Sequence, residues 1–500
     1  MIVPFSVMDF LDRAAAVYRD RLGVVDEPHQ PASSMGELTY GELGAKAAAM
    51  AAHLDRLGIE VGERVAFVSH NSARLLAAFF GVSGYGRVLV PVNFRLSARE
   101  VGYIVEHSGA RVLYVDPELE HDLADVECEH LFIDGIAPRA WEPDENATAT
   151  INYTSGTTAR PKGVQLTHRN LWTNAMTFAL HAGVTDRDVY LHTLPMFHAN
   201  GWGMPFAMAG MGVPQVVLRK VDGAEILHRV ERHGVTVLCA APAVVNAVLG
   251  AASTWQGQVP GRGRVRIICA GAPPPTKTIV RVEQELGWEF IQIYGLTETS
   301  PLLTINRGRS EWDTLPPQER AARLVRAGAP AIGVTLKVSQ DAEVLARSNV
   351  VLEGYWNQPE ETGAALGDGW FHTGDGGMID DDGYLTIQDR KKDVIITGGE
   401  NVSSIEVEDV IFSHPEVAEV AVIGVPDEKW GETIKALVVR VEGSDLREAD
   451  LIAHCKAQAA HYKAPTSVEF REALARTATG KLQKYKLREP YWEGRDRRVN

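Results

Sequence analysis

Short apolar runs alternate with helix-like segments through roughly the first four hundred residues of the chain. Leu38 to Leu57 is predicted to form a helix with Thr39 as its N-cap, because threonine hydroxyls accept from free backbone amides at helix starts. Arg64 to Val68 and Val88 to Val92 are predicted strands, with a helix over Ala73 to Phe80 between them. This alternation predicts an α/β fold of βα-layered parallel sheets.

The end of the chain has its own pattern, which predicts a second domain. With 500 residues, the chain exceeds the size that one hydrophobic core normally serves. The charged cluster Asp389 to Asp393 is followed by a helix candidate, Ser404 to Ser413, two apolar runs and a further helix candidate. We therefore expect a large domain over residues 1–390 and a small α+β domain over residues 391–500.

Three glycine-containing motifs each follow an apolar run of strand type. SGTT follows Ala149 to Tyr153, AGAPPP follows Val265 to Cys269, and YGLTE follows Glu289 to Ile293. Ligands of open α/β sheets lie beyond the carboxyl ends of the strands. The three motifs are therefore expected to surround one nucleotide site.

The motif YTSGTTARPKGV, Tyr153 to Val164, is suited to phosphate. Glycine lets a ligand approach the backbone, while hydroxyls and lysine can bind phosphate oxygens. It differs from the GxxxxGK[ST] loop of P-loop NTPases at Pro161 and Gly163, which disfavours that class. Alone, the motif could also be a polar linker.

From LTYGEL at Leu38 to TGKLQK at Thr479, the ordered motifs resemble the adenylate-forming superfamily of acyl-CoA synthetases, adenylation domains and luciferases. The resemblance implies ATP and coenzyme A as co-substrates. One departure is Ala159, where the family usually has glycine, and this should stiffen the loop. The ATP-binding residues that the resemblance implies are Thr154, Ser155, Gly156, Thr157, Thr158, Lys162, Gly271, Ala272, Pro273, Tyr294, Asp375 and Arg390.

Glu298 is the predicted magnesium ligand. A carboxylate next to a triphosphate is repulsive unless a cation lies between them, and Thr154 is a second candidate ligand. The resemblance implies that Tyr294 stacks on adenine, that Thr297 contacts the α-phosphate, and that Asp375 binds the ribose hydroxyls with help from Arg390. Read singly, these residues could belong to ordinary turns or surface charges.

The family joins acid and ATP to give acyl-AMP, then rotates its small domain so that a thiol can attack the acyl carbon. The resemblance makes Lys481 the catalytic lysine, which would neutralise charge on the α-phosphate. It makes Lys392 the hinge between the domains. The residues implied for the coenzyme A tunnel are His198, Gly398, Gly399 and Glu400.

LPMFHANGW, Leu194 to Trp202, resembles the medium- and long-chain fatty-acyl-CoA synthetases. It implies a substrate pocket of His198, Trp202, Ala241 and Gly295, with His198 also catalytic. The alternative is that this histidine and this tryptophan are ordinary residues of the hydrophobic core. No basic residue is present to pair with a second carboxylate, which favours an apolar monocarboxylic acid. An aromatic or alicyclic acid remains open.

The formal charge of −15 argues against nucleic acid as a partner. Four scattered cysteines and the lack of a signal peptide pattern favour the cytoplasm. Val189 to Leu218 has no Asp, Glu, Lys or Arg, but its prolines favour a buried pocket wall over a membrane helix. The chain could also act as a homodimer.

Alternatives to an acyl-CoA synthetase are an acyl-AMP ligase serving a carrier protein, a luciferase-type oxidase and a non-catalytic nucleotide-binding protein.

Overall fold

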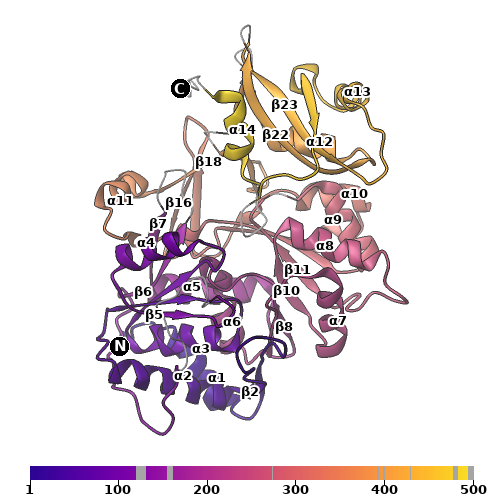
Figure 1. Ribbon diagram of the computed structural model, residues 1–500. Helices are drawn as coiled ribbons and strands as arrows, with labels where there is room; N and C mark the ends of the chain where they lie inside the picture. The colour runs from indigo at the N-terminus through magenta and orange to yellow at the C-terminus, as the bar shows by residue number, and fades with distance from the viewer. Residues whose placement is uncertain are drawn as a thin grey trace.

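The computed structural model describes residues 1–119, 131–154, 161–272, 274–390, 393–397, 400–427, 430–476 and 482–493, without the side chains of Asp389, Arg390 and Asn401. A large α/β body carries a smaller domain, drawn in orange to yellow at the top of Figure 1. This arrangement confirms the predicted fold class. The residue at which one domain passes into the other stays a prediction.

The first sheet of the large body carries the arms of the phosphate motif. β3, β4, β5 and β6 run parallel, whereas β7 and β17 are antiparallel to their neighbours. β3 and β4 have the predicted bounds. In sheet order the six strands are β17 (Gly354–Tyr355), β7 (Lys162–Thr167), β6 (Thr148–Thr154), β4 (Val88–Val92), β3 (Arg64–Val68) and β5 (Ala110–Val115).

The second sheet carries the other two motifs on the neighbouring parallel strands β11 and β12. It is also mixed: the predicted parallel pairing is present between most of its strands, and antiparallel pairs that were not predicted occur beside it. Local patterning does not encode pairing direction, and antiparallel strands here complete the sheet edges. The order is β14 (Ala329–Pro330), β13 (Thr304–Arg307), β12 (Glu289–Tyr294), β11 (Arg266–Cys269), β10 (Val237–Ala240), β8 (Tyr190–His192), β9 (Gln215–Val217), β1 (Leu22–Val25) and β2 (Glu37–Thr39).

Helices pack on both sheets through two apolar clusters. Thr39 caps α2 as predicted, in a reciprocal pair with Glu42, although Leu38 belongs to β2 and not to the helix. The helices of the large body are α1 (Met8–Val17), α2 (Tyr40–Arg56), α3 (Ala73–Gly81), α4 (Ala98–Ser108), α5 (His168–Ala182), α6 (Met204–Gly210), α7 (Gly223–His233), α8 (Pro242–Ala252), α9 (Thr276–Arg281), α10 (Pro317–Leu324) and α11 (Pro359–Ala365).

A third, antiparallel sheet leads toward the small domain. Its strands, in order, are β15 (Val334–Val338), β16 (Glu343–Ser348), β18 (Phe371–Ile379) and β19 (Leu385–Arg390). The small domain contains β21 (Glu400–Val402), β20 (Ile395–Thr397), β23 (Gly431–Arg440), β22 (Val417–Asp427) and β24 (Ser467–Phe470), with α12 (Ser404–Phe412), α13 (Glu448–Gln458) and α14 (Lys484–Trp492). Its buried residues form a separate apolar cluster that includes Ile395, Val422 and Leu451.

The uncharged segment Val189 to Leu218 folds as β8, a short turn of helix, α6 and β9. Most of its side chains are buried, in agreement with the predicted interior role. In the part of the chain that the structure covers, no helix has the length and apolar character needed to cross a membrane.

Candidate active site

The two arms of the phosphate motif form an antiparallel strand pair. Thr154 ends β6 and lies opposite Lys162, the first residue of β7. The predicted ATP-binding residues Ser155, Gly156, Thr157 and Thr158 are outside the described residues. The fold therefore presents a hydroxyl and an amine from adjacent strand ends at this edge of the first sheet.

Tyr355 joins Lys162 to Glu298. The Tyr355 hydroxyl donates to Glu298 Oε1 at 2.9 Å. Lys162 Nζ lies 4.9 Å from the centroid of the Tyr355 ring, within the range of a cation–π contact. Because β7 belongs to the first sheet and Glu298 follows β12 of the second, this contact brings two of the three predicted motifs together.

The loop after β12 is held by its backbone. Thr297 and Glu298 lie in a short 3-10 helix, Thr297–Thr299, and the Glu298 carbonyl accepts from the Leu352 amide at 2.7 Å. A Cβ at Gly295 would come within 1.5 Å of the Pro301 carbonyl oxygen. Close packing against Pro301 thus requires glycine here, and its role in an acid pocket stays a prediction.

The hydroxyl of Tyr294 donates to Asp375 Oδ2 at 2.8 Å. This bond joins the end of β12 to β18 of the third sheet. In the strand pairing Asp375 lies opposite Arg390, whose side chain falls outside the described residues. Tyr294, predicted to stack on adenine, and Asp375, predicted to bind the ribose, are therefore in direct contact. Arg390, the second predicted ribose residue, lies opposite Asp375 in the strand pairing.

The predicted far wall of the adenine slot follows β11. Gly271 has a φ of +96°, and no neighbour lies within 4 Å of the position that a Cβ would take. The backbone conformation, not a close contact, is thus the reason for glycine at this position. Ala272 follows it, and Pro273 lies outside the described residues.

The turn that holds His198 and Trp202 has an unusual backbone. Ala199, Asn200 and Trp202 have φ values of 44°, 53° and 62°, a left-handed conformation that side chains disfavour. Trp202 is only 5% exposed and belongs to the main apolar cluster, so the core interpretation of this tryptophan gains support. Ala241, also predicted for the pocket, is buried at the start of α8.

Hydrogen bonds between buried side chains connect this turn to β6, the strand that leads into the phosphate motif. The sequence analysis did not predict them. Asn200 Nδ2 donates to Thr150 Oγ1 at 2.9 Å, and Asn152 Nδ2 donates to Asn200 Oδ1 at 3.0 Å. Thr150 also donates to Asn152 Oδ1 at 2.9 Å. Thr150 and Asn152 are polar residues inside an apolar run, a signal that they needed buried partners.

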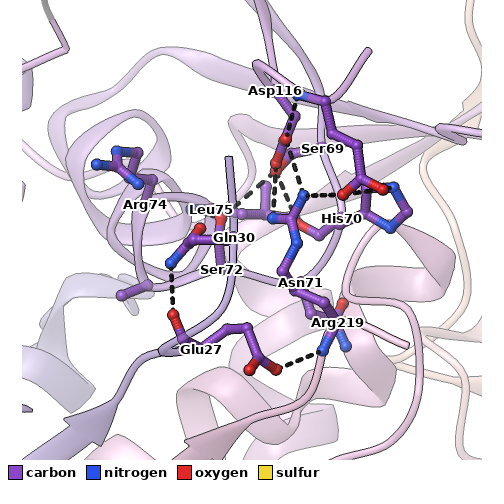
Figure 2. A network of polar contacts seen from close by, with 12 residues as sticks. Glu27, Gln30, Ser69, His70, Asn71, Ser72, Arg74, Leu75, Asp116 and Arg219 are labelled. Atoms are coloured by element: carbon purple, nitrogen blue, oxygen red, sulfur yellow. Dashed lines mark hydrogen bonds and ion pairs between the residues drawn. The ribbon is translucent and has the colours of Figure 1, made fainter. Parts of the chain in front are cut away.

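Asn71 supports the same segment from the other side. Its side-chain amide donates to the carbonyls of His192 and Leu194, and its Oδ1 accepts from the Met196 amide at 2.7 Å. Beside it, Figure 2 shows Asp116 bound by Ser69 and by both terminal nitrogens of Arg219, at 2.8 and 2.9 Å from the latter. These groups follow β3, β5 and β9, so the network ties the two large sheets together.

The predicted residues of the small domain are largely outside the described residues. These are Lys392, Gly398, Gly399 and Lys481. Glu400 is described, begins β21 and is exposed. Among the residues that the structure covers, no group of three or more histidines, cysteines or carboxylates could hold a metal ion.

Known families and proteins are similar to this chain over almost its whole length. Residues 11–356 match the AMP-binding enzyme family, and residues 406–481 match the AMP-binding enzyme C-terminal domain. The 2-methylpropanoate–CoA ligase of Humulus lupulus is 36% identical over 97% of this chain and 95% of the relative. The 4-hydroxybutyrate–CoA ligase 2 of Metallosphaera sedula is 38% identical over 96% of this chain and 93% of the relative.

Among solved structures, the fatty acyl CoA synthetase of Mycobacterium tuberculosis is 32% identical, covers 97% of this chain and 98% of its own, and superimposes with a TM-score of 0.69. The chain belongs to the AMP-binding enzyme family, and its class is that of the AMP-forming acid–CoA ligases.

Proposed function

We propose that this ligase activates an apolar monocarboxylic acid with ATP and then forms its coenzyme A thioester. A carboxylate oxygen of the acid attacks the α-phosphorus, and pyrophosphate leaves. The thiol then attacks the acyl carbon, and AMP leaves. The observation that carries the proposal is the meeting of Lys162 and Glu298 on Tyr355, since polyphosphate chemistry needs a cation and a metal-binding carboxylate close together.

The nucleotide residues have separate roles in this proposal. Asp375 and Arg390 bind the ribose hydroxyls, Tyr294 stacks on adenine, and Thr297 contacts the α-phosphate. The bond between Tyr294 and Asp375 supports the first two roles, because it brings both groups to one place. Lys481 neutralises the charge that develops on the α-phosphate as pyrophosphate leaves.

Glu298 and Thr154 are suited to hold Mg²⁺. Both offer oxygen, and Glu298 is a partly exposed carboxylate at the loop after β12. Mg²⁺ commonly takes one or two carboxylates and completes its shell with water and substrate phosphates. A single carboxylate here fits an ion that arrives with ATP. When bound, Mg²⁺ reduces the negative charge of the phosphates.

The acid is proposed to be a medium- or long-chain fatty acid. The chain near the proposed pocket is uncharged from Val189 to Leu218, and Phe197 and Trp202 are buried there. An unpaired second carboxylate would be costly in such surroundings. A short acid is the second candidate, favoured by two relatives named for 2-methylpropanoate and 4-hydroxybutyrate.

Transfer to coenzyme A requires the small domain to turn between the two steps. In this proposal Lys392 is the hinge, and Gly398, Gly399 and Glu400 line the thiol tunnel together with His198. The cytoplasmic location and the homodimer stay predictions.

The test is pyrophosphate release over a panel of acids, with and without coenzyme A. The panel should include straight-chain acids of increasing length, 2-methylpropanoate, 4-hydroxybutyrate and an aromatic acid. We expect release with fatty acids and thioester formation when coenzyme A is added. Release without thioester would favour a carrier-protein acceptor, and no release with any acid would refute the proposal.

A further inference from the structure

Tyr355 lies outside every motif that the sequence analysis singled out, yet it contacts two residues of the proposed site. Its hydroxyl donates to Glu298 Oε1 at 2.9 Å, and its ring lies 4.9 Å from Lys162 Nζ. One side chain therefore touches both the proposed metal ligand and the proposed phosphate lysine. The three residues come from different parts of the chain and meet only in the fold.

The backbone around Tyr355 fixes the place of its ring. Tyr355 lies opposite Val164 of β7, and its amide donates to Thr362 Oγ1 at 2.9 Å. The Trp356 amide donates to the Gly163 carbonyl at 2.7 Å, and the Leu352 amide donates to the Glu298 carbonyl at 2.7 Å. The segment from Leu352 to Trp356 thus bridges the Glu298 loop and the strand of Lys162.

The chemistry of a phenol suits this place. The hydroxyl of a tyrosine carries its proton at neutral pH, so it can donate to the carboxylate of Glu298. A neutral donor orients a carboxylate without cancelling its charge, which stays available to a cation. The face of the ring attracts the Lys162 ammonium by its quadrupole.

We propose that Tyr355 is a positioning residue for the complex of Mg²⁺ and the ATP triphosphate. Its hydroxyl orients Glu298 toward the metal ion, and its ring holds Lys162 near the phosphates. This rests on the proposed function, because it takes Glu298 as the metal ligand.

Calorimetric binding of ATP without any acid tests the proposal. The titrations are done with Mg²⁺ and with EDTA. For Tyr355→Phe, which keeps the ring, we expect the Kd with Mg²⁺ to rise about tenfold and the Kd in EDTA to change by less than about twofold. For Tyr355→Leu, which also removes the ring, the Kd should rise in both titrations. Equal weakening of both titrations by Tyr355→Phe would overturn the proposal.

Tyr491→Phe is the matched control. The Tyr491 hydroxyl donates to Glu469 in the small domain, so this variant also removes a bond between a phenol and a glutamate. It should leave the ratio of the two ATP affinities unchanged. A change in that ratio equal to the change in Tyr355→Phe would also overturn the proposal, because it would show a general effect on folding.

A double-mutant cycle with Glu298→Gln gives a second measurement. If Tyr355 acts through Glu298, adding Tyr355→Phe to Glu298→Gln should not weaken Mg²⁺-dependent binding further, whereas independent effects would add. If the proposed function is wrong, acid-dependent pyrophosphate release will be absent, which is a separate measurement. If the wild-type protein binds ATP with the same affinity in Mg²⁺ and in EDTA, the role of Tyr355 is overturned even when pyrophosphate release is seen.

Discussion

The carboxylate of Asp409, on α12 of the small domain, accepts hydrogen bonds from the backbone amide of Thr276 at 3.0 Å and from its hydroxyl at 3.3 Å. Thr276 begins α9 of the large body, directly after the AGAPPP motif. The small domain is thus bonded to the wall of the proposed adenine slot. Any rotation of that domain has to break these bonds.

We predict that Asp409→Ala slows acid-dependent pyrophosphate exchange about 10- to 150-fold relative to thioester formation from supplied acyl-AMP, since hydrogen bonds to a charged group contribute about 1.5–3 kcal/mol and every 1.4 kcal/mol is a factor of ten. The bonds between Asp409 and Thr276 stabilise the orientation in which the small domain lies against the wall of the proposed adenine slot. The prediction takes this orientation as the one that serves the first step.

The control for that experiment is Asp450→Ala. Asp450 is a carboxylate of the same domain that pairs with Arg447 and does not depend on the large body for this contact. It should leave the ratio of the two half-reactions unchanged. Equal slowing of both half-reactions by Asp409→Ala would contradict the prediction.

Lys481→Ala is predicted to reduce pyrophosphate exchange by about 100-fold or more, because charge on the α-phosphate would lose its counter-ion. Conversion of supplied acyl-AMP to thioester should persist. Comparing the two assays on one preparation separates a chemical defect from misfolding. Normal exchange in this variant would rule out the proposed role.

Asn200 offers a test of the support beneath the His198 turn. Asn200→Gly keeps the left-handed backbone and removes the bonds to Thr150 and Asn152, whereas Asn200→Ala also adds strain. Leaving those buried partners unpaired should cost about 1–3 kcal/mol of folding free energy. We expect both variants to have a lower melting temperature than the wild type, with the larger decrease for Asn200→Ala. Both should also raise the KM of the acid more than the KM of ATP. A glycine variant with wild-type melting and acid KM would disprove a role for the side chain.

Stability should fall on acidification. Burial lowers the pKa of His168 and of His192 to about 4, although a bond to Gln215 opposes the shift at His192. Unfolded histidine has a pKa of about 6.5, so the unfolded chain takes up these protons first as the pH drops. The stabilisation is complete above about pH 6.5 and is lost toward pH 4, with about 2 kcal/mol per histidine gone at pH 5.

Melting temperatures measured between pH 7.5 and pH 5 check this expectation. The melting temperature of His192→Gln should be lower than that of the wild type at pH 7.5, because the change disturbs the buried pair of His192 and Gln215. It should then decrease less steeply as the pH is lowered. The same slope in the variant and the wild type would show that His192 does not contribute.

Local patterns predicted much of the fold. β3 and β4 have their predicted bounds, and Thr39 caps α2, because strand alternation and capping are properties of neighbouring residues. The antiparallel pairing of β6 with β7 was not predicted, since pairing direction depends on the whole sheet. The motifs pointed to Glu298 and Asp375 by resemblance. Tyr355 was missed because its partner Glu298 is 57 positions away and β17 is only two residues long.

The left-handed turn at Ala199, Asn200 and Trp202 restricts how this enzyme can evolve. Each such residue costs about 1–2 kcal/mol relative to an ordinary helical backbone, and a β-branched replacement would raise that cost. Few residue types are therefore expected to be tolerated at these three positions. A library aimed at a new acid preference should leave the turn intact and vary α8, where Val244 is only partly buried on a regular helix.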